Sequence, residues 1–267
     1  MTDGPTTPSV QDVSDWWTTA VSRIEPDVIE LRGRPVQELI GTTSFVGVIW
    51  LLLRGQQPTP GQERLLEAAL VAAVDHGPHA PSIAVARMAV TCGIGLNNAI
   101  ATGVNTLGDV HGGAGEQCIT MLAEVGRRAA DGLDLDDAAS TVIDDWRTRS
   151  RYLPGFGHRF HSVDPRREPL LGLVREAGAD GVVDGTYLRA AEAIERILAT
   201  GRRRPVPINV DGCTAVVYGE LGFAPPLARG LFVLSRSVGI LAHAWEEAGQ
   251  GRRNKGPIPP SVLPTFE

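Results

Sequence analysis

Apolar residues recur along most of the chain at the three- and four-residue spacing of amphipathic helices, and strand-like alternation is scarce. Proline falls between these stretches or in their first turns, where a helix tolerates it. Alanine, the strongest helix former, is abundant. We therefore expect an all-α fold with less than about a tenth of the residues in strands, and helices at residues 60–74, 82–106, 112–130, 136–149, 168–177, 186–199, 213–221 and 225–248.

The beginning of the chain has a less regular pattern. Residues 1–10 are polar and rich in proline and threonine, which predicts a disordered tail. The apolar spacing around residues 16–24 predicts a first helix, and segments 28–31 and 34–36 flank Gly33 as the arms of a small β-hairpin would. Further along, three glycines disfavour a continuous helix over 82–106, namely Gly93, Gly95 and Gly103.

Composition and charge narrow the class of protein. With 267 residues, 43% of them hydrophobic, the chain can bury one large core or a large and a small domain. The net charge is -6 and basic runs such as 202–204 are short, so we expect no nucleic-acid partner. Three cysteines without metal-ligand spacing indicate reduced thiols and a cytoplasmic location. The longest apolar run, 45–53, is too short to span a membrane, and the N-terminus lacks the order of a signal peptide.

Two residues at predicted helix starts suit the chemistry of an enolate, which needs a carboxylate base and a neutral hydrogen-bond donor. His111 precedes Gly112 and Gly113, where the helix dipole would disfavour its charged form. Asp211 lies between apolar residues, and burial would raise its pKa and its strength as a base. Each residue has a structural alternative that is favoured when it is considered alone: both are common helix-capping positions.

Four further polar residues could bind a substrate. His158 closes a loop made of Pro154, Gly155, Phe156 and Gly157, whose backbone amides could line a nucleotide or thioester pocket. Three side chains have positions suited to an anion, each with an alternative: Arg166 could be solvated at its helix start, Arg236 could reach the surface from its apolar helix, and His76 could only complement a helix dipole.

Taken together and in this order, the motifs resemble those of the citrate synthase superfamily, and more closely its short citryl-CoA lyase branch, which is similar to the carboxyl-terminal lyase portion of ATP-citrate lyase. The resemblance extends over about residues 17–254. The motifs that carry it are Asp75-His76-Gly77-Pro78, His111-Gly112-Gly113, Gly155-Phe156-Gly157-His158-Arg159, Asp164-Pro165-Arg166, Asn209-Val210-Asp211-Gly212 and the segment from Phe232 to Gly239 that contains Arg236.

The resemblance implies a large helical domain and a smaller helical domain, inserted at roughly 115–220 within a catalytic unit of residues 11–267. The active site would lie in the cleft between the two domains of a homodimer. By resemblance, Asp211 takes the proton from the acyl-CoA methyl group, His111 stabilises the enolate, and His158 polarises the ketone of the 2-oxo acid or deprotonates the tertiary hydroxyl. It also implies substrate binding by His76, Arg166 and Arg236, and coenzyme A binding by Pro154, Gly155, Phe156 and Gly157.

The C-terminus departs from the pattern of the family. Many relatives carry an Arg-Pro pair whose arginine reaches into the partner subunit's site to hold a carboxylate. This chain has Gly256 at that position, or Pro259 in a shifted register. The loss would remove a charge-assisted bond of about 1.5–3 kcal/mol, unless Lys255 or Arg253 compensates. An oxo acid with a less acidic or bulkier far end is therefore an alternative to oxaloacetate.

From these residues and this resemblance we expect a carbon-carbon lyase. It would cleave a 3-hydroxy-3-carboxyacyl-CoA such as citryl-CoA to acetyl-CoA and oxaloacetate through an enolate, with the thioester as substrate, no metal and no tightly bound cofactor. One alternative is condensation of an acyl-CoA with a 2-oxo acid, as in citrate or 2-methylcitrate synthase. A second is a non-catalytic paralogue that binds coenzyme A. Residues 82–106 are apolar around most of the helix, which also favours a homodimer.

Overall fold

The computed structural model describes residues 9–157, 162–201, 206–259, 261–263, 265 and 266. Helices make up most of this part of the chain, and the strands in it form a single small sheet, so the predicted all-α fold is confirmed. The chain divides into two compact units, residues 1–63 and 64–267, which are described in turn.

The first unit contains short helices and a three-stranded antiparallel sheet. Helix α1 (Val10–Trp16) is followed by β1 (Ser22–Glu25), β2 (Val28–Leu31), β3 (Arg34–Pro35) and α2 (Val36–Leu39). The hairpin prediction is confirmed, because β2 pairs with β3. The helix predicted around residues 16–24 is wrong: a capping box of Ser9 and Asp12 starts α1 earlier, and Ile24 pairs with Ile29 across the sheet. The disordered tail was predicted at residues 1–10. Its first eight residues lie outside the described part of the chain, whereas Ser9 caps α1 and Val10 begins it.

The apolar run 45–53 forms a helix that the periodicity did not predict, α3 (Phe45–Arg54). The Ser44 side chain accepts a hydrogen bond from the Gly47 N–H at its start, and Gly55 ends it in the left-handed conformation. Trp50 and Leu51 are buried. The next helix, α4 (Pro60–Ala73), begins as predicted at a capping box, in which Thr59 and Gln62 exchange hydrogen bonds.

Among its described residues, the second unit consists of helices joined by loops, with two isolated β-bridges. The stretch 82–106 is two helices, because Gly93 turns the chain in a left-handed conformation and Gly95 starts the second one. The other predicted helices lie within three residues of their expected ends. In order, the helices after α4 are α5 (Pro81–Thr91), α6 (Leu96–Val104), α7 (Ala114–Ala130), α8 (Leu135–Arg149), α9 (Arg167–Ala179), α10 (Thr186–Ala199), α11 (Val210–Glu220) and α12 (Pro225–Gln250).

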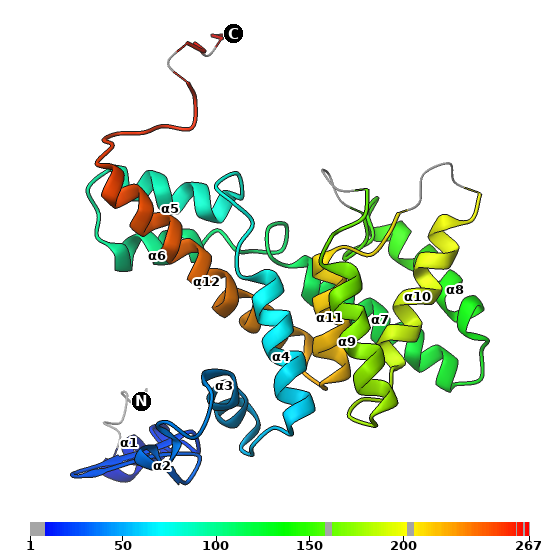
Figure 1. The fold of residues 1–267 in the computed structure, drawn as a ribbon, viewed down its shortest axis with the longest axis horizontal. Helices are drawn as coiled ribbons and strands as arrows, with labels where there is room; N and C mark the ends of the chain where they lie inside the picture. The colour runs from blue at the N-terminus through cyan, green and yellow to red at the C-terminus, as the bar shows by residue number, and fades with distance from the viewer. Residues whose placement is uncertain (1–8, 158–161, 202–205, 260, 264, 267) are drawn as a thin grey trace, which may run out of the picture. The chain divides into compact units, whose positions relative to one another are not determined.

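Two groups of helices pack within this unit (Figure 1). Helix α12 packs against α5 and α6, where Ile83, Ala86 and Ile240 are fully buried. Helices α7 and α10 contact each other and both α8 and α11, and α9 packs on α11. Helix α12 also contacts α7 and so connects the two groups. The insertion boundary at roughly 115–220 stays a prediction.

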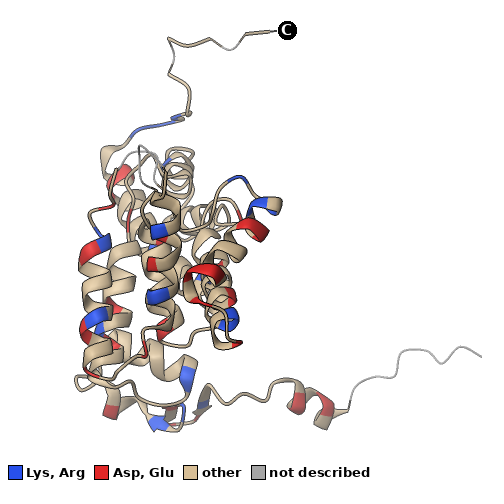
Figure 2. Cartoon of the chain, turned by 90° about the vertical axis from the view of Figure 1, so that its right-hand side faces the viewer, with Lys and Arg blue, Asp and Glu red and all other residues tan. Residues whose placement is uncertain are grey.

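Helix α12 is the longest in the described chain, at 26 residues. Its length and composition would allow it to cross a membrane, but buried core helices pass the same test, and α12 packs against α5, α6 and α7. Figure 2 shows that acidic and basic residues are interspersed over the helices.

Candidate active site

Two arginines bind the carboxyl-terminal end of α4, directly before the Asp75-His76 turn. Arg166 donates to the carbonyl of Ala72 at 3.1 Å, and Arg236 donates to that of Ala73 at 3.1 Å. The last carbonyls of a helix have no partner within the helix, so they accept these bonds readily. The structure therefore brings Arg166, Arg236 and the turn that carries His76 together, although they are far apart in sequence.

Arg236 is buried, with 5% of its surface exposed, so it does not reach the surface. Its guanidinium lies 5.0 Å from the ring centre of Phe232. Burial lowers the pKa of Arg236, and the charges of Asp211 and Asp75 oppose this effect, whereas that of Arg166 adds to it. The carboxylates of Asp211 and Asp75 therefore help to keep the buried Arg236 positively charged. A buried positive charge of this kind is suited to binding an anionic substrate.

Asp164 is a buried carboxylate that holds Arg166 in place. Its two oxygens accept the Nε and Nη2 of Arg166, both at 2.9 Å, and also accept the backbone N–H groups of Arg166 and Val210. Burial alone would raise the pKa of Asp164, but these bonds keep it below its ordinary value. Arg166 is therefore fixed and not simply solvated. In the sequence, Asp164 stands out only as part of the Asp164-Pro165-Arg166 motif, and its spacing of two residues from Arg166 is the signal that could have indicated this ion pair.

Asp211 lies in the first turn of α11. The helix cap is Asn209, whose side chain accepts the N–H groups of Asp211 and Gly212, so the capping alternative for Asp211 is wrong. Burial raises the pKa of the Asp211 carboxyl, and the charges of Arg236 and Arg166 oppose the shift. A carboxylate in this environment is a stronger base than an exposed one, which is what abstraction of a proton from carbon requires.

His111 lies between α6 and α7. Its Nε2 is 3.2 Å from the backbone nitrogen of Ser82 and 3.0 Å from the Ser82 hydroxyl. Since a backbone N–H can only donate, Nε2 accepts that bond, and the proton of the neutral ring is on Nδ1. Burial lowers the pKa of His111, and the charge of Arg236 lowers it further. The cause therefore differs from the helix dipole that we expected, and Gly113, not His111, is the N-cap of α7.

The loop that carries His111 is tied to α7 and α12. Arg229 of α12 forms ion pairs with Asp109, at 2.7 Å, and with Glu116 of α7. The Gln117 side chain donates to the carbonyl of Asp109 at 3.2 Å. These contacts fix the loop on both sides of His111.

A cavity of about 920 Å³ lies beside this cluster. Loop residues 150–157 form one wall. The other lining residues are Asp109, Val110, Ala114, Gln117, Arg147, Leu198, Val206 and Asn209. Val110 neighbours His111 in sequence, and Asn209 caps the helix of Asp211, but neither His111 nor Asp211 itself lines the cavity.

The loop of Pro154, Gly155, Phe156 and Gly157 is held against the segment that precedes α11. Asn209 donates its backbone N–H to Gly155 at 2.9 Å and its side-chain amide to Gly157 at 2.7 Å. Gly155 has φ +81°, and a Cβ there would meet the Cys118 sulfur at 2.6 Å and the backbone of Gly212. A larger residue does not fit at this position.

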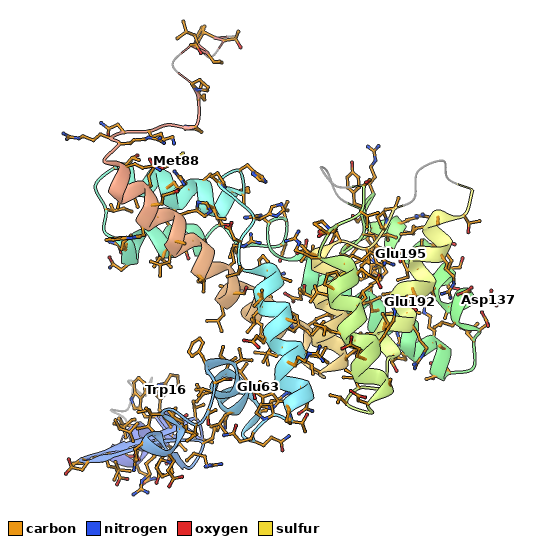
Figure 3. All side chains as sticks on the ribbon, viewed as in Figure 1. Trp16, Glu63, Met88, Asp137, Glu192 and Glu195 are labelled. Carbon is orange, nitrogen blue, oxygen red and sulfur yellow. The ribbon has the colours of Figure 1, made fainter. Side chains whose placement is uncertain are left out.

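A further ion pair supports the same segment from α10. Glu195, labelled in Figure 3, accepts the Arg167 Nε at 3.0 Å and the Ile208 backbone N–H at 3.0 Å. Two separate carboxylates, Asp164 and Glu195, therefore fix the segment that leads into Asp211.

The remaining predicted residues lie elsewhere or cannot be placed. His158 lies outside the described residues. Lys255 donates its backbone N–H to the Thr91 hydroxyl at 3.0 Å, and its ammonium is 3.9 Å from Glu247, while Arg253 and Gly256 are exposed. Within the part of the chain that the structure describes, no group of three or more His, Cys, Asp or Glu residues is arranged to hold a metal ion.

Comparison with known families decides the classification. The profile of the family described as "Citrate synthase, C-terminal domain" matches residues 53–258, which is most of the chain. The chain belongs to this family. The resemblance inferred from the sequence motifs is confirmed, as is the citrate synthase-like helical fold that it implied.

Solved structures and curated sequences give the same family. A citryl-CoA lyase from Hydrogenobacter thermophilus is similar, with a TM-score of 0.81 and 29% identity over 94% of this chain and 95% of that one. An ATP citrate lyase from Methanothrix soehngenii, at 20% identity, shares the fold with a TM-score of 0.79 over 100% of this chain and 46% of that one. A citrate synthase from Helicobacter pylori is 31% identical over 85% of this chain and 51% of its own length. The chain spans about half the length of the curated citrate synthases that it matches.

Proposed function

We propose that this member of the citrate synthase family cleaves citryl-CoA, or a close 3-hydroxy-3-carboxyacyl-CoA, to acetyl-CoA and oxaloacetate. The observation that carries the proposal is the buried guanidinium of Arg236, whose charge acts on both predicted catalytic residues: it limits the rise in the pKa of Asp211 and, together with burial, lowers the pKa of His111. These are the protonation properties required of an enolate site. The match to a citryl-CoA lyase over nearly all of both chains supports this direction of reaction.

In the cleavage direction, Arg166 and Arg236 hold the carboxylates of the substrate. His158 accepts the proton of the tertiary hydroxyl, the new carbonyl forms, and the electrons of the broken carbon-carbon bond pass into the thioester as an enolate. The Nδ1–H of His111 donates a hydrogen bond to the enolate oxygen. Asp211 then gives its proton to the carbon, a step for which its raised pKa is suited.

Coenzyme A enters as part of the substrate, and we place it in the cavity beside the loop of residues 154–157. At about 920 Å³ the cavity has the size of a small-molecule site. Arg147 and Arg151 in its lining supply positive charge suited to the phosphates.

The test is to incubate the purified protein with citryl-CoA and to measure oxaloacetate and acetyl-CoA directly. Acetyl-CoA and propionyl-CoA are assayed separately with a panel of 2-oxo acids. Release of free coenzyme A in these mixtures, without cleavage of citryl-CoA, would support the synthase alternative. Binding of coenzyme A without any turnover would support the non-catalytic alternative.

We also propose that the protein is a homodimer in the cytoplasm. Four apolar residues on one face of α12 are between 41% and 67% exposed, namely Leu234, Val238, Leu241 and Trp245. Their spacing of three or four residues makes a continuous apolar stripe, which a second copy would cover. Residues 82–106 stay a second predicted part of the interface; Ile83 of that stretch is buried within the chain, whereas Ile94 is exposed.

Replacing Leu241 with glutamate should therefore shift the protein towards monomers, because it places a charge within the proposed interface. Sedimentation velocity at micromolar concentration measures this shift. Val71→Glu adds the same charge to an exposed apolar residue of α4, outside the stripe, and should leave the assembly unchanged. A wild-type protein that sediments as a monomer would contradict the proposal, and cell fractionation tests the location.

A further inference from the structure

His243 of α12 joins the Asp75-His76 turn to a set of buried charges, and no motif pointed to it. Its Nε2 lies 3.2 Å from Oδ1 of Asp75, and its Nδ1 lies 3.2 Å from Nη1 of Arg87. Only 19% of the side chain is exposed. The ring thus contacts the carboxylate of Asp75 through Nε2 and the guanidinium of Arg87 through Nδ1, which also lies 4.0 Å from the carboxylate of Glu246.

These two contacts determine which nitrogen of His243 carries the proton. A guanidinium has donors only, so the bond from Arg87 requires a lone pair on Nδ1. The ring is then neutral, and its proton is on Nε2, where it is directed at the carboxylate of Asp75. Arg87 therefore sets the tautomer in which His243 can donate to Asp75.

Arg87 is itself fixed by α12. Its guanidinium lies 2.6 Å from Glu246 and 2.6 Å from Glu247, whose side chain is fully buried. A buried carboxylate needs a charged partner, so removing Arg87 from Glu247 would be costly. The C-terminal segment adds two weaker contacts to Glu247, at 3.8 Å from Arg252 and 3.9 Å from Lys255.

Asp75 in turn holds the backbone of residues 75–77. Its Oδ2 accepts the backbone N–H of Gly77 at 3.2 Å. Burial alone would raise the pKa of Asp75, but the N–H of Gly77, the His243 ring and the N–H of His76 together hold it below its ordinary value. Gly239 lets the turn lie directly on α12, since a Cβ at this position would meet the Val74 carbonyl and Asp75.

We propose that His243 is a positioning residue for His76. By holding Asp75, it fixes the turn at residues 75–77 so that His76 contacts the oxo-acid part of the substrate beside Arg166 and Arg236. The inference rests on the proposed function of this site. The two arginines bind α4 through Ala72 and Ala73 without His243, so its loss affects His76 and leaves them in place.

The test compares two variants. His243→Leu removes both polar contacts and should raise the KM for citryl-CoA by at least about tenfold, the effect of losing a hydrogen bond to a charged group. The affinity for coenzyme A and the melting temperature should change little. His243→Gln keeps a donor for Asp75 and an acceptor for Arg87, and should stay within about threefold of wild type. An unchanged KM in the leucine variant, equal losses in both variants, or a parallel loss of coenzyme A affinity would overturn the proposal.

A second measurement separates this inference from the proposed function. The chain has six histidines, so their ring resonances can be assigned by NMR with single substitutions. In His243→Leu the ring signals of His76 should move, whereas those of His111, held by Ser82, should not. Absence of cleavage by wild type would overturn the proposed function alone. Unmoved His76 signals would overturn the positioning role, whatever the activity.

Discussion

Asp211, the proposed catalytic base, shows at the scale of one residue how a group suited to proton transfer can oppose stability. Its pKa is raised in the folded protein above the value in an unfolded chain. The folded state therefore binds this proton more tightly, and the contribution to stability is present at low pH and is lost as the pH rises through the raised pKa. Above the raised pKa, the ionised side chain therefore lowers the stability of the folded protein.

Replacing Asp211 with asparagine should abolish exchange of the acetyl-CoA methyl protons with solvent, because only a carboxylate can take that proton. The same variant should melt at a temperature equal to or above that of wild type at pH 8, and the difference should shrink as the pH falls. Exchange is followed by NMR in deuterated water, and melting by calorimetry at several pH values. Exchange at the wild-type rate would show that another residue is the base.

Asp164 leads to a second prediction at this scale. Asp164→Asn keeps the size of the side chain but loses the ion pair with Arg166. The new side-chain NH₂ group, itself a donor, would face the N–H donors that now bind the carboxylate. Because the carboxylate is buried, we expect a loss of about 3 kcal/mol or more of stability, and weaker binding of the oxo acid. Urea unfolding measures the first effect, and calorimetry with oxaloacetate the second. Asp184→Asn, which alters an exposed helix-end carboxylate away from the site, is the control.

At the scale of elements, most helix positions could be predicted from the local sequence. Where a prediction failed, the reason also lies in the local sequence. The capping box at Thr59 and the prolines marked helix starts correctly. Helix α3 was missed because its apolar run is nearly continuous and shows little periodicity. The site was less accessible from sequence, since the bonds that define it join residues far apart: His111 and Ser82 are separated by 29 positions, and Arg236 and Ala73 by 163. Motifs could identify the residues but not these partners.

The contact between the 154–157 loop and α11 gives a prediction for these elements. Gly155→Ala places a methyl group against Cys118 and Gly212 in a left-handed backbone conformation. We expect the loop to move from α11, with lower affinity for coenzyme A and a melting temperature several degrees lower. Gly132 also has a positive φ but has open space around it, so Gly132→Ala measures the effect of the left-handed backbone conformation alone. Equal effects in both variants would show that the packing against Cys118 is unimportant.

At the scale of the whole molecule, the C-terminal segment leads to a prediction about the substrate, because many relatives carry there an arginine that holds a carboxylate and this chain does not. Lys255 is directed at Glu247 within its own chain, so it is occupied there. If the carboxylate contact is absent, Gly256→Arg, or Pro259→Arg in the shifted register, should improve the use of citryl-CoA relative to analogues with a less acidic or bulkier far end. Competition assays between the substrates measure this ratio. A wild-type preference for citryl-CoA of about a hundredfold or more would show that another residue supplies the contact.

The anchoring of Arg166 and Arg236 on the last carbonyls of α4 has a consequence for the entropy of binding. Freezing a long, flexible side chain on association costs about 0.5–1.5 kcal/mol. Both guanidinium groups already have their directions set by the protein, through Ala72 and Ala73, before any substrate arrives. Two such side chains spare roughly 1–3 kcal/mol, or about one to two powers of ten in affinity. A short peptide segment that accepts no ligand itself can thus determine how tightly an anion is bound.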